Sequence, residues 1–276
     1  MKYLSVNLLI ITLLLISCKK SIEDDGLKTL GIKTTTVSQY SVSGNNGTIN
    51  KGVSITRITC HFDEKGKITA KIDHDLARDV EYKFSFIYDG SGKKTEMNFS
   101  YNDNRILYRI IYGYDTNGFL TDEKFNSTVG GFPYRYEYKN DEKGNQIVND
   151  YYNSEDKLSS RTTYSYDSKN RMIEMRYHSP STFLSWRKTF TYNDAGTEKN
   201  EFNYYTDGTL AERIVYFYDD QGYLIEQNGY GFENVLYEKL IFAHSEPDKY
   251  GNWTVRKDYR NNECILISER VIEYYK

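Results

Sequence analysis

The stretch that decides the fold is Arg213–Leu224, which reads RIVYFYDDQGYL. The residues before Asp219 are mostly β-branched or aromatic, and these types favour strands. Gly222 follows Asp219 by three positions. That pattern is typical of a type I turn, because the Asp carboxylate accepts backbone N–H bonds and glycine tolerates a positive φ. The stretch therefore predicts a strand, a tight turn and the start of a returning strand.

Variants of this turn recur along the chain at intervals of 24 to 28 residues, and a weaker set of turns lies between them. Half of that interval holds one strand and one turn, which leaves no room for a crossover helix. We therefore expect an all-β fold, an antiparallel meander of two-strand hairpin units of about 26 residues, with about 16 strands in one domain. Periodicity does not tell whether the strip is open, coiled or closed. The leading aromatic residues of the strong turns are Phe62, Tyr88, Tyr114, Tyr138, Tyr166, Tyr192 and Tyr218.

The two faces of the predicted sheet differ. Aromatic residues stand two positions apart before the turns, as in Tyr112 and Tyr114, which places both on one face. A basic residue usually stands three positions before the first aromatic residue of the pair, and this odd spacing places it on the opposite face. The bases are Arg109, Arg161, Arg187, Arg213 and Lys239, and the acids expected to pair with them across strands are Glu123, Glu174, Glu198 and Glu226.

The N-terminus predicts export. Lys2 precedes an apolar run from Leu4 to Ile16, which at about 13 residues is shorter than the roughly 20 that a membrane helix needs. The run ends at Cys18 and resembles a bacterial lipobox, whose Cys is lipidated; the alternative is an ordinary secretory signal with an incidental Cys. We predict a lipoprotein signal peptide at 1–17, lipidation of Cys18, a flexible tether at 18–50 and the repeat domain at 51–276.

The predicted address is the cell envelope. The segment after Cys18 reads KKSIEDD and resembles the surface-export signal of lipoproteins in Bacteroidetes-type bacteria, although it also fits a plain solvated linker. An outer-membrane lipoprotein, periplasmic or surface-exposed, is the expectation, with the membrane as one partner through lipid on Cys18. The net charge of −3 argues against nucleic acid, which requires a basic face.

The turns resemble the YD (Rhs-type) repeat, whose signature is Tyr-Asp-x-x-Gly-x-Leu with a second Tyr upstream. The resemblance covers about residues 56–276. It implies a long antiparallel β-strip that coils into a shell and serves surface display, sugar binding or toxin encapsulation. The period here is longer than is usual in that family, and no toxin region follows the last predicted strand, Ser268–Tyr275. The stretch from Asp248 to Tyr275 also resembles the ending of Bacteroidetes repeat lipoproteins.

No residues stand out as a reaction centre, and no cofactor, metal or catalytic residue is predicted. The four His are scattered over different repeats. The three residues Asp73, His74 and Asp75 are adjacent, so on a strand their side chains point to alternate faces. The candidate binding residues are Trp186, Trp253 and Arg187, because Trp contributes most to sugar stacking or partner anchoring. The alternative is that each Trp fills a gap in the packed face.

Cys60 and Cys264 stand near opposite ends of the repeats. An extracytoplasmic setting permits a disulfide, but a bridge between them requires an array that closes on itself. Otherwise both are buried small apolar residues.

The sequence thus predicts a non-catalytic, lipid-anchored repeat protein that binds a glycan or protein partner through one sheet face. One alternative is a structural or protective module for a co-exported protein. A third hypothesis, a carbohydrate-active enzyme, stays open because fold does not determine function.

Overall fold

The chain forms one antiparallel sheet. The computed structural model describes residues 31–43, 49–102, 104–131, 133–179, 184–245 and 247–276, and within them the sheet has eighteen strands. A short 3-10 helix, η1 (Phe232–Asn234), lies between β15 and β16. The strands are β1 (Ile32–Ser43), β2 (Asn50–Phe62), β3 (Ile68–Asp75), β4 (Val80–Tyr88), β5 (Lys94–Tyr101), β6 (Arg105–Tyr114), β7 (Leu120–Ser127), β8 (Tyr134–Asn140), β9 (Gln146–Tyr152), β10 (Leu158–Tyr166), β11 (Met172–Ser179), β12 (Leu184–Tyr192), β13 (Glu198–Tyr204), β14 (Leu210–Tyr218), β15 (Leu224–Tyr230), β16 (Leu236–His244), β17 (Val255–Arg260) and β18 (Glu263–Tyr274).

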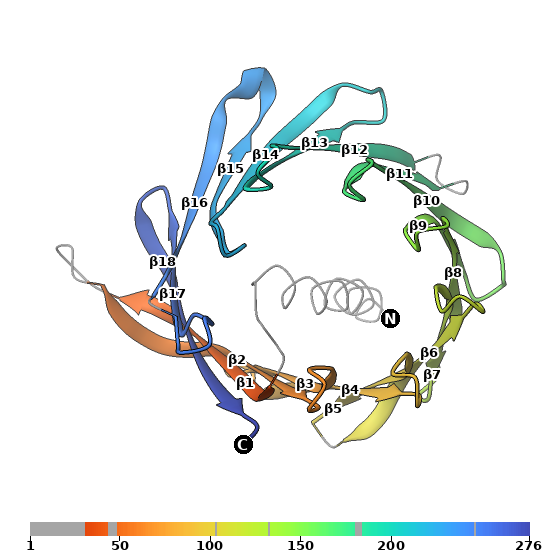
Figure 1. The fold of residues 1–276 in the computed structure, drawn as a ribbon, viewed down its shortest axis with the longest axis horizontal. Coiled ribbons are helices and arrows are strands. Elements are labelled where there is room, and N and C mark those ends of the chain that lie inside the picture. Colours follow the sequence, from red (N-terminus) through yellow and green to blue (C-terminus); the bar gives the residue numbers. More distant parts are fainter. Residues whose placement is uncertain (1–30, 44–48, 103, 132, 180–183, 246) are drawn as a thin grey trace.

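The sheet closes into a ring. Each strand pairs with the next strand in sequence, and β18 pairs with β1. Val37 of β1, for example, lies opposite Ile58 of β2 and Arg270 of β18. Figure 1 shows the resulting barrel. The predicted meander of hairpin units is confirmed, and among the open, coiled and closed arrangements the chain adopts the closed one. Closure leaves no unpaired sheet edge among the eighteen described strands.

The tight turns have the chemistry predicted for Asp and Gly. After β6, Asp115 Oδ1 accepts the backbone N–H of Phe119 at 2.8 Å, and the N–H of Gly118 donates to the Asp115 carbonyl at 3.0 Å. Gly118 has a φ of 88°, and Asn170 has a φ of 62° in the equivalent turn. The same carboxylate-to-backbone bond recurs at Asp63, Asp89, Asp141, Asp167, Asp219 and Asp248.

The repeat is more regular in space than in sequence. A tyrosine hydroxyl at the end of an even-numbered strand donates to a carbonyl of the preceding hairpin unit, as in Tyr114 to Lys94 at 2.7 Å and Tyr166 to Gln146 at 2.9 Å. Between them, Asn140 Nδ2 makes the equivalent bond to Leu120 at 2.7 Å. Positions 114, 140 and 166 are evenly spaced, so Asn140 holds the repeat position. The uneven sequence intervals around Tyr138 therefore reflect a substitution and not an insertion.

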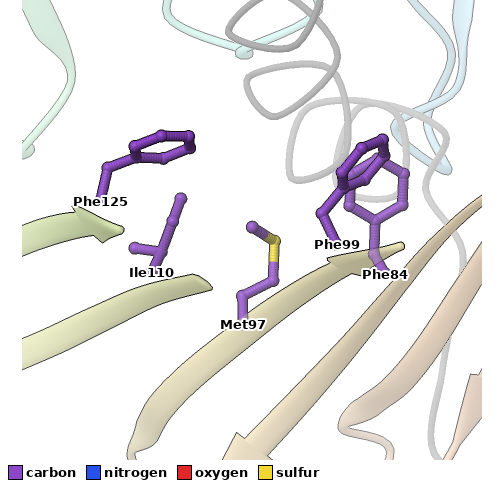
Figure 2. Close-up of a cluster of buried hydrophobic side chains, with 5 residues drawn as sticks. All are labelled: Phe84, Met97, Phe99, Ile110 and Phe125. Carbon is purple, nitrogen blue, oxygen red and sulfur yellow. The ribbon is translucent and has the colours of Figure 1, made fainter. Parts of the chain in front are cut away.

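The aromatic face is the inner wall of the ring. Figure 2 shows Phe84, Met97, Phe99, Ile110 and Phe125 projecting together from β4 to β7 toward the interior. All five side chains are buried. Their strand pairing follows the same order, with Phe84 opposite Phe99 and Met97 opposite Ile110. The sequence pattern separated two faces, and the curvature of the sheet decides that the aromatic one is enclosed.

The basic ladder lies on the outer wall. The bases there are about half exposed, which matches their place on the convex side. Arg213 stacks over Tyr230 with its guanidinium 4.5 Å from the ring centroid. The ion pairs are Arg109–Glu96 at 3.2 Å, Arg161–Asp150 at 2.6 Å, Arg187–Glu174 at 2.7 Å and Lys239–Glu226 at 2.9 Å.

Two of the four acids expected on this ladder take other positions. Glu123 lies opposite Tyr136 on the inner wall. Side chains alternate along the strand, so the sequence neighbours of Glu123 are the residues that face outward. Glu198 accepts a bond from Asn200 Nδ2 at 2.8 Å. Glu174 and Glu226 pair with the ladder as expected.

The sheet begins earlier than the sequence suggested. The stretch predicted as a tether, 18–50, contains β1, which pairs on both sides with β2 and β18. Its sequence, IKTTTVSQYSVS, is polar but rich in β-branched residues, which favour strands. The last strand begins at Glu263 and not at Ser268. The predicted signal peptide and Cys18 lie outside the described residues.

No disulfide joins Cys60 and Cys264. Cys60 lies opposite Thr35 of β1, and Thr35 lies opposite Ile272 of β18. Cys264 precedes Ile272 by eight residues on the same strand, which is about 26 Å at roughly 3.3 Å per residue. Ring closure therefore brings the two strands near each other without bringing the two thiols together.

Candidate functional site: the inner wall of the ring

Strand pairing extends the inner face from β7 to β12. Tyr134 lies opposite Phe125, and Tyr136 lies opposite Tyr151. Farther on, Tyr177 lies opposite Trp186. Directly paired residues share a face, as do residues two apart on a strand. On β10, Ser160 lies opposite Tyr151, and Thr162, two residues on, lies opposite Tyr177. Trp186 therefore lies on the inner wall.

The rings on this wall form a continuous aromatic band. It consists of Phe84, Phe99, Tyr108, Phe125, Tyr134, Tyr136 and Tyr151, from β4 to β9. Successive centroids are 5.1 Å apart for Phe84–Phe99, 5.5 Å for Phe99–Tyr108, 5.0 Å for Tyr108–Phe125, 4.3 Å for Phe125–Tyr134 and 5.7 Å for Tyr134–Tyr151. Aromatic pairs at such distances contribute about 0.5–1.5 kcal/mol each beyond the area they bury.

The tyrosines of this region are uncharged at neutral pH. Burial raises the pKa of Tyr134, Tyr136 and Tyr138, and the negative charge of Glu123 raises each further. Their hydroxyls therefore keep their protons and are able both to donate and to accept hydrogen bonds. The band offers apolar ring surface and neutral hydroxyls.

The ring is too wide for its own wall to fill. Eighteen strands about 4.8 Å apart give a backbone radius of at least about 14 Å, and strand tilt increases it. Facing sheets pack about 10 Å apart, so the side chains of one wall fill about 5 Å. A central region about 9 Å in radius is thus beyond the reach of the wall side chains.

The wall becomes charged toward β17 and β18. Trp253 is 1% exposed, and the Arg270 guanidinium lies 3.5 Å from its ring centroid. The His244 ring lies 5.7 Å from that of Trp253. Burial, together with the charges of Arg256 and Arg270, lowers the pKa of His244 to about 4, against a weaker opposing effect of Asp219. His244 is therefore neutral at pH 7.

Buried ion pairs complete this charged sector. Arg256 donates to both carboxylate oxygens of Asp258, at 2.8 and 3.1 Å. Lys71 Nζ lies 2.8 Å from Asp73 on β3. Burial raises the pKa of both aspartates, and the neighbouring cation opposes that rise in each case. The inner wall thus has an aromatic sector and a charged sector.

The structure does not bring the three predicted binding residues together. Trp186 is half-buried on the inner wall and stacks on Tyr177, with centroids 5.3 Å apart and planes 7° apart. Arg187, its neighbour in sequence, faces outward and contacts Glu174 and the ring of Tyr204. Trp253 is enclosed in the charged sector, where it fills the wall.

Sequence reasoning missed the charged sector. Arg256 and Asp258 stand two apart, as do Ser268 and Arg270, and that spacing places each pair on one face. The signal was present, but alternation alone did not show that this face of β17 and β18 is the enclosed one.

The side chains of Asp73, His74 and Asp75 point to alternate faces, as the alternation of a strand requires. Asp73 faces inward to Lys71, His74 Nε2 lies 3.0 Å from Asp79, and Asp75 accepts backbone N–H bonds from Ala77 and Arg78. Among the described residues, no three His, Cys, Asp or Glu side chains are placed to hold a metal ion. No helix in the part of the chain that the structure describes is long and apolar enough to cross a membrane.

Comparisons with known proteins do not assign the chain to a family. No family model matches it, and no curated protein sequence matches it. The structure is similar to a porin-like protein from Bacteroides uniformis, with a TM-score of 0.47 and 8% identity over 89% of this chain and 99% of the other.

Two toxin structures are also similar. The TcdB2–TccC3 complex gives a TM-score of 0.28 at 13% identity, and the Tc holotoxin pore of Photorhabdus luminescens gives 0.34 at 12%. Each match covers 82% of this chain and 17% of the toxin chain. The likeness to the YD repeat therefore rests on the turn motif of the sequence.

Proposed function

We propose that the protein is a non-catalytic, lipid-anchored shell of the cell envelope that holds a polypeptide or glycan partner against the inner wall of its ring. The observation that carries the proposal is the aromatic band on the enclosed face of a ring too wide to be filled by its wall. Some rings on the same wall, such as Tyr177 and Trp186, remain partly exposed, and covering apolar surface of this kind with a bound partner is favourable by about 25 cal/mol per Å².

The outer wall supports a water-facing shell. Transmembrane barrels present an apolar band about 25 Å tall to the lipid. Here the outward positions carry ion pairs such as Arg161–Asp150 and Arg187–Glu174. Placing these charges in hydrocarbon costs several kcal/mol each. The distribution of polarity is thus the reverse of that in a lipid-embedded barrel, and it favours an envelope protein held by its anchor.

The stacked pair Tyr177 and Trp186 is the proposed contact for a partner. Both rings are half-buried, unlike Trp253, and their nearly parallel planes offer a flat apolar face. Such a face suits either a sugar ring or a peptide side chain. The polar neighbours on the same wall include Lys188, paired with Glu201 at 2.6 Å, and Asn203, whose Nδ2 donates to Glu212 at 3.0 Å.

Adjacent positions on opposite walls provide the test. A photo-crosslinking residue, p-benzoylphenylalanine, is introduced at Trp186 or at Arg187 in the full chain, expressed with its own export signal. We expect adducts from position 186 and none from 187. Protease or glycosidase digestion of the adduct then identifies the partner as polypeptide or glycan. Adducts from 187 alone, or none from 186 and from Tyr164 on the same wall, would contradict the proposal.

The anchor is tested separately. Cys18→Ala removes the predicted lipidation site, and lipid chains contribute about 0.8 kcal/mol per buried methylene. We expect the protein to leave the membrane fraction. Unchanged membrane retention would exclude lipid on Cys18 as the anchor, and protease treatment of intact cells distinguishes surface from periplasmic exposure.

A further inference from the structure

The two rims of the barrel differ in polarity. Because consecutive strands are antiparallel, alternate connections lie at opposite rims. The connections from even to odd strands form the Asp rim, where the seven aspartate turns lie, from Asp63 to Asp248. The connections from odd to even strands form the other rim, which we call the apolar rim.

The apolar rim carries a cluster of exposed hydrophobic side chains. At the β15–β16 connection, Phe232 is 81% exposed and Val235 is 62% exposed, and Leu236 and Tyr237 follow them. At the neighbouring β13–β14 connection, Tyr205 and Leu210 are exposed as well. Figure 1 shows these two hairpins extending beyond the outline of the ring. Contiguous exposed hydrophobic groups of this kind mark interaction surfaces.

Further exposed groups continue around the same rim. Val53, Val129, Leu158 and Ile265 lie in or beside the β1–β2, β7–β8, β9–β10 and β17–β18 connections. Toward the Asp rim, the exposed large hydrophobic residues of the described chain are fewer, namely Ile87, Ile173, Ile225, Tyr250, Val271 and Tyr275. The exposed hydrophobic surface is therefore concentrated at one end of the barrel.

We propose that the apolar rim docks on a lipid bilayer, with the β13–β14 and β15–β16 hairpin tips inserted at its surface. The exposed groups sit on separate convex tips distributed around a ring, and no single rigid partner groove matches that arrangement. A bilayer is planar and fluid, so it meets all the tips at once. Tyr, Phe and Leu are also residue types that lie in the membrane interface.

The charges near the tips specify the kind of lipid surface. Glu233 lies within η1, and Tyr237 hydrogen-bonds Glu212 beside it. These carboxylates disfavour a surface rich in anionic lipid. The geometry points instead to binding of electrically neutral lipid by hydrophobic insertion, which salt does not screen.

The sequence between Cys18 and β1 is long enough for this orientation. The thirteen residues from Lys19 to Gly31 span up to about 45 Å when extended, and β1 starts at the Asp rim. The wall is about 30 Å high, judged from the nine residues of β14 at roughly 3.3 Å each. An anchor at Cys18 therefore reaches the plane of the apolar rim. The inference does not depend on a partner inside the ring.

The experiment uses the chain from Lys19 to Lys276, which lacks the lipid but retains every strand of the ring, and phosphatidylcholine vesicles. We expect the protein to float with the vesicles at physiological salt and equally at about 1 M salt. In the Phe232→Ser/Val235→Ser variant we expect vesicle partition to fall about tenfold or more, from the loss of two inserted side chains.

Val271→Ser is the matched control, because Val271 is 66% exposed but lies toward the Asp rim. We expect it to partition like the unchanged protein, and circular dichroism checks that all variants keep the sheet. The proposal is overturned if the unchanged chain stays off the vesicles, if about 1 M salt removes it, or if Val271→Ser weakens partition as strongly. If the unchanged chain does not bind vesicles but self-associates, and the Phe232→Ser/Val235→Ser variant does not self-associate, the apolar rim would instead bind a second copy of the chain.

Discussion

The inner and outer walls are built from the same strands and differ most in how deeply their side chains are buried. The inner wall buries Phe84, Phe99 and Phe125 at 2–4% exposure, whereas the outer wall keeps charged side chains such as Arg109 and Arg187 near half exposure. Burying a large apolar side chain contributes about 1.5–3 kcal/mol, and an exposed ion pair about 0–1 kcal/mol. The comparison indicates that the enclosed face contributes most of the stability of the ring, while the ion pairs of the outer face contribute little.

The largest expected effect is therefore on the inner wall. Phe99→Ala removes a ring that contacts Tyr82, Phe84 and Tyr108. We expect the free energy of unfolding to fall by about 3–5 kcal/mol, measured by urea denaturation. Ile87→Ala, on the outer wall of an adjoining strand and 47% exposed, is the control and should cost less than about 1 kcal/mol. Equal losses would refute the distinction between the walls.

A second effect concerns the charged sector of the inner wall. His244 has a pKa of about 4, lowered first by burial and then by Arg256 and Arg270, whereas an unfolded His has a pKa of about 6.5. Between these values the unfolded state binds more protons, so His244 makes the free energy of unfolding rise with pH from about 4 to 6.5.

Because His244 is only half-buried, we expect this contribution to be about 1–2 kcal/mol. The measurement is urea denaturation of the unchanged protein and of His244→Gln across the window. The variant should be relatively more stable at pH 4 than at pH 7. Parallel pH profiles for the two proteins would contradict a lowered pKa at this position.

The turns belong to neither wall, and a substitution in a turn is expected to lower the free energy of unfolding by less. Asp219 Oδ1 accepts N–H bonds from Gln221 at 3.0 Å and Tyr223 at 2.8 Å. Asp219→Ala is expected to cost about 1 kcal/mol, read from the urea midpoint. Asp220→Ala, at the adjacent exposed position of the same turn, should leave stability nearly unchanged. The turn chemistry is wrong if Asp220 matters as much as Asp219.

The smallest effect is expected on the outer wall. Arg187 Nε lies 2.7 Å from Glu174, and both side chains are partly exposed. A double-mutant cycle with Arg187→Ala and Glu174→Gln should give a coupling energy below about 1 kcal/mol. A coupling as large as the loss from Phe99→Ala would mean that the ladder stabilises the ring as much as the band does.

Local spacing was sufficient to predict most of the fold. The Asp-to-Gly turn in Asp115–Gly118, the hairpin units and the separation of Tyr112 and Tyr114 from Arg109 all depend on residues close in sequence. The chemistry of a turn and the alternation of a strand act over a few residues, so a sequence displays them directly.

Closure and the inner site depended on contacts distant in sequence. The β1–β18 pairing joins residues such as Val37 and Arg270, and nothing within the Thr-rich β1 indicates its partner. Trp186 and Arg187 were grouped as one candidate site, although neighbouring residues of a strand such as β12 face opposite ways, and local spacing does not tell which side is enclosed. The stacking of Arg270 on Trp253, by contrast, depends on the β17–β18 hairpin, whose pairing of Val255 with Glu269 brings β18 beside the β16–β17 connection.

The combination of a uniform unit and a closed ring restricts how such a chain can change in length. Each unit of 26 residues contributes two strands, so gaining or losing one changes the circumference by about 10 Å and the radius by about 1.5 Å. Because strands are added in pairs, the strand count stays even, and the first and last strands still meet in antiparallel pairing. Duplication of a unit would thus widen the ring in fixed steps, while both ends of the sheet remain at the same rim.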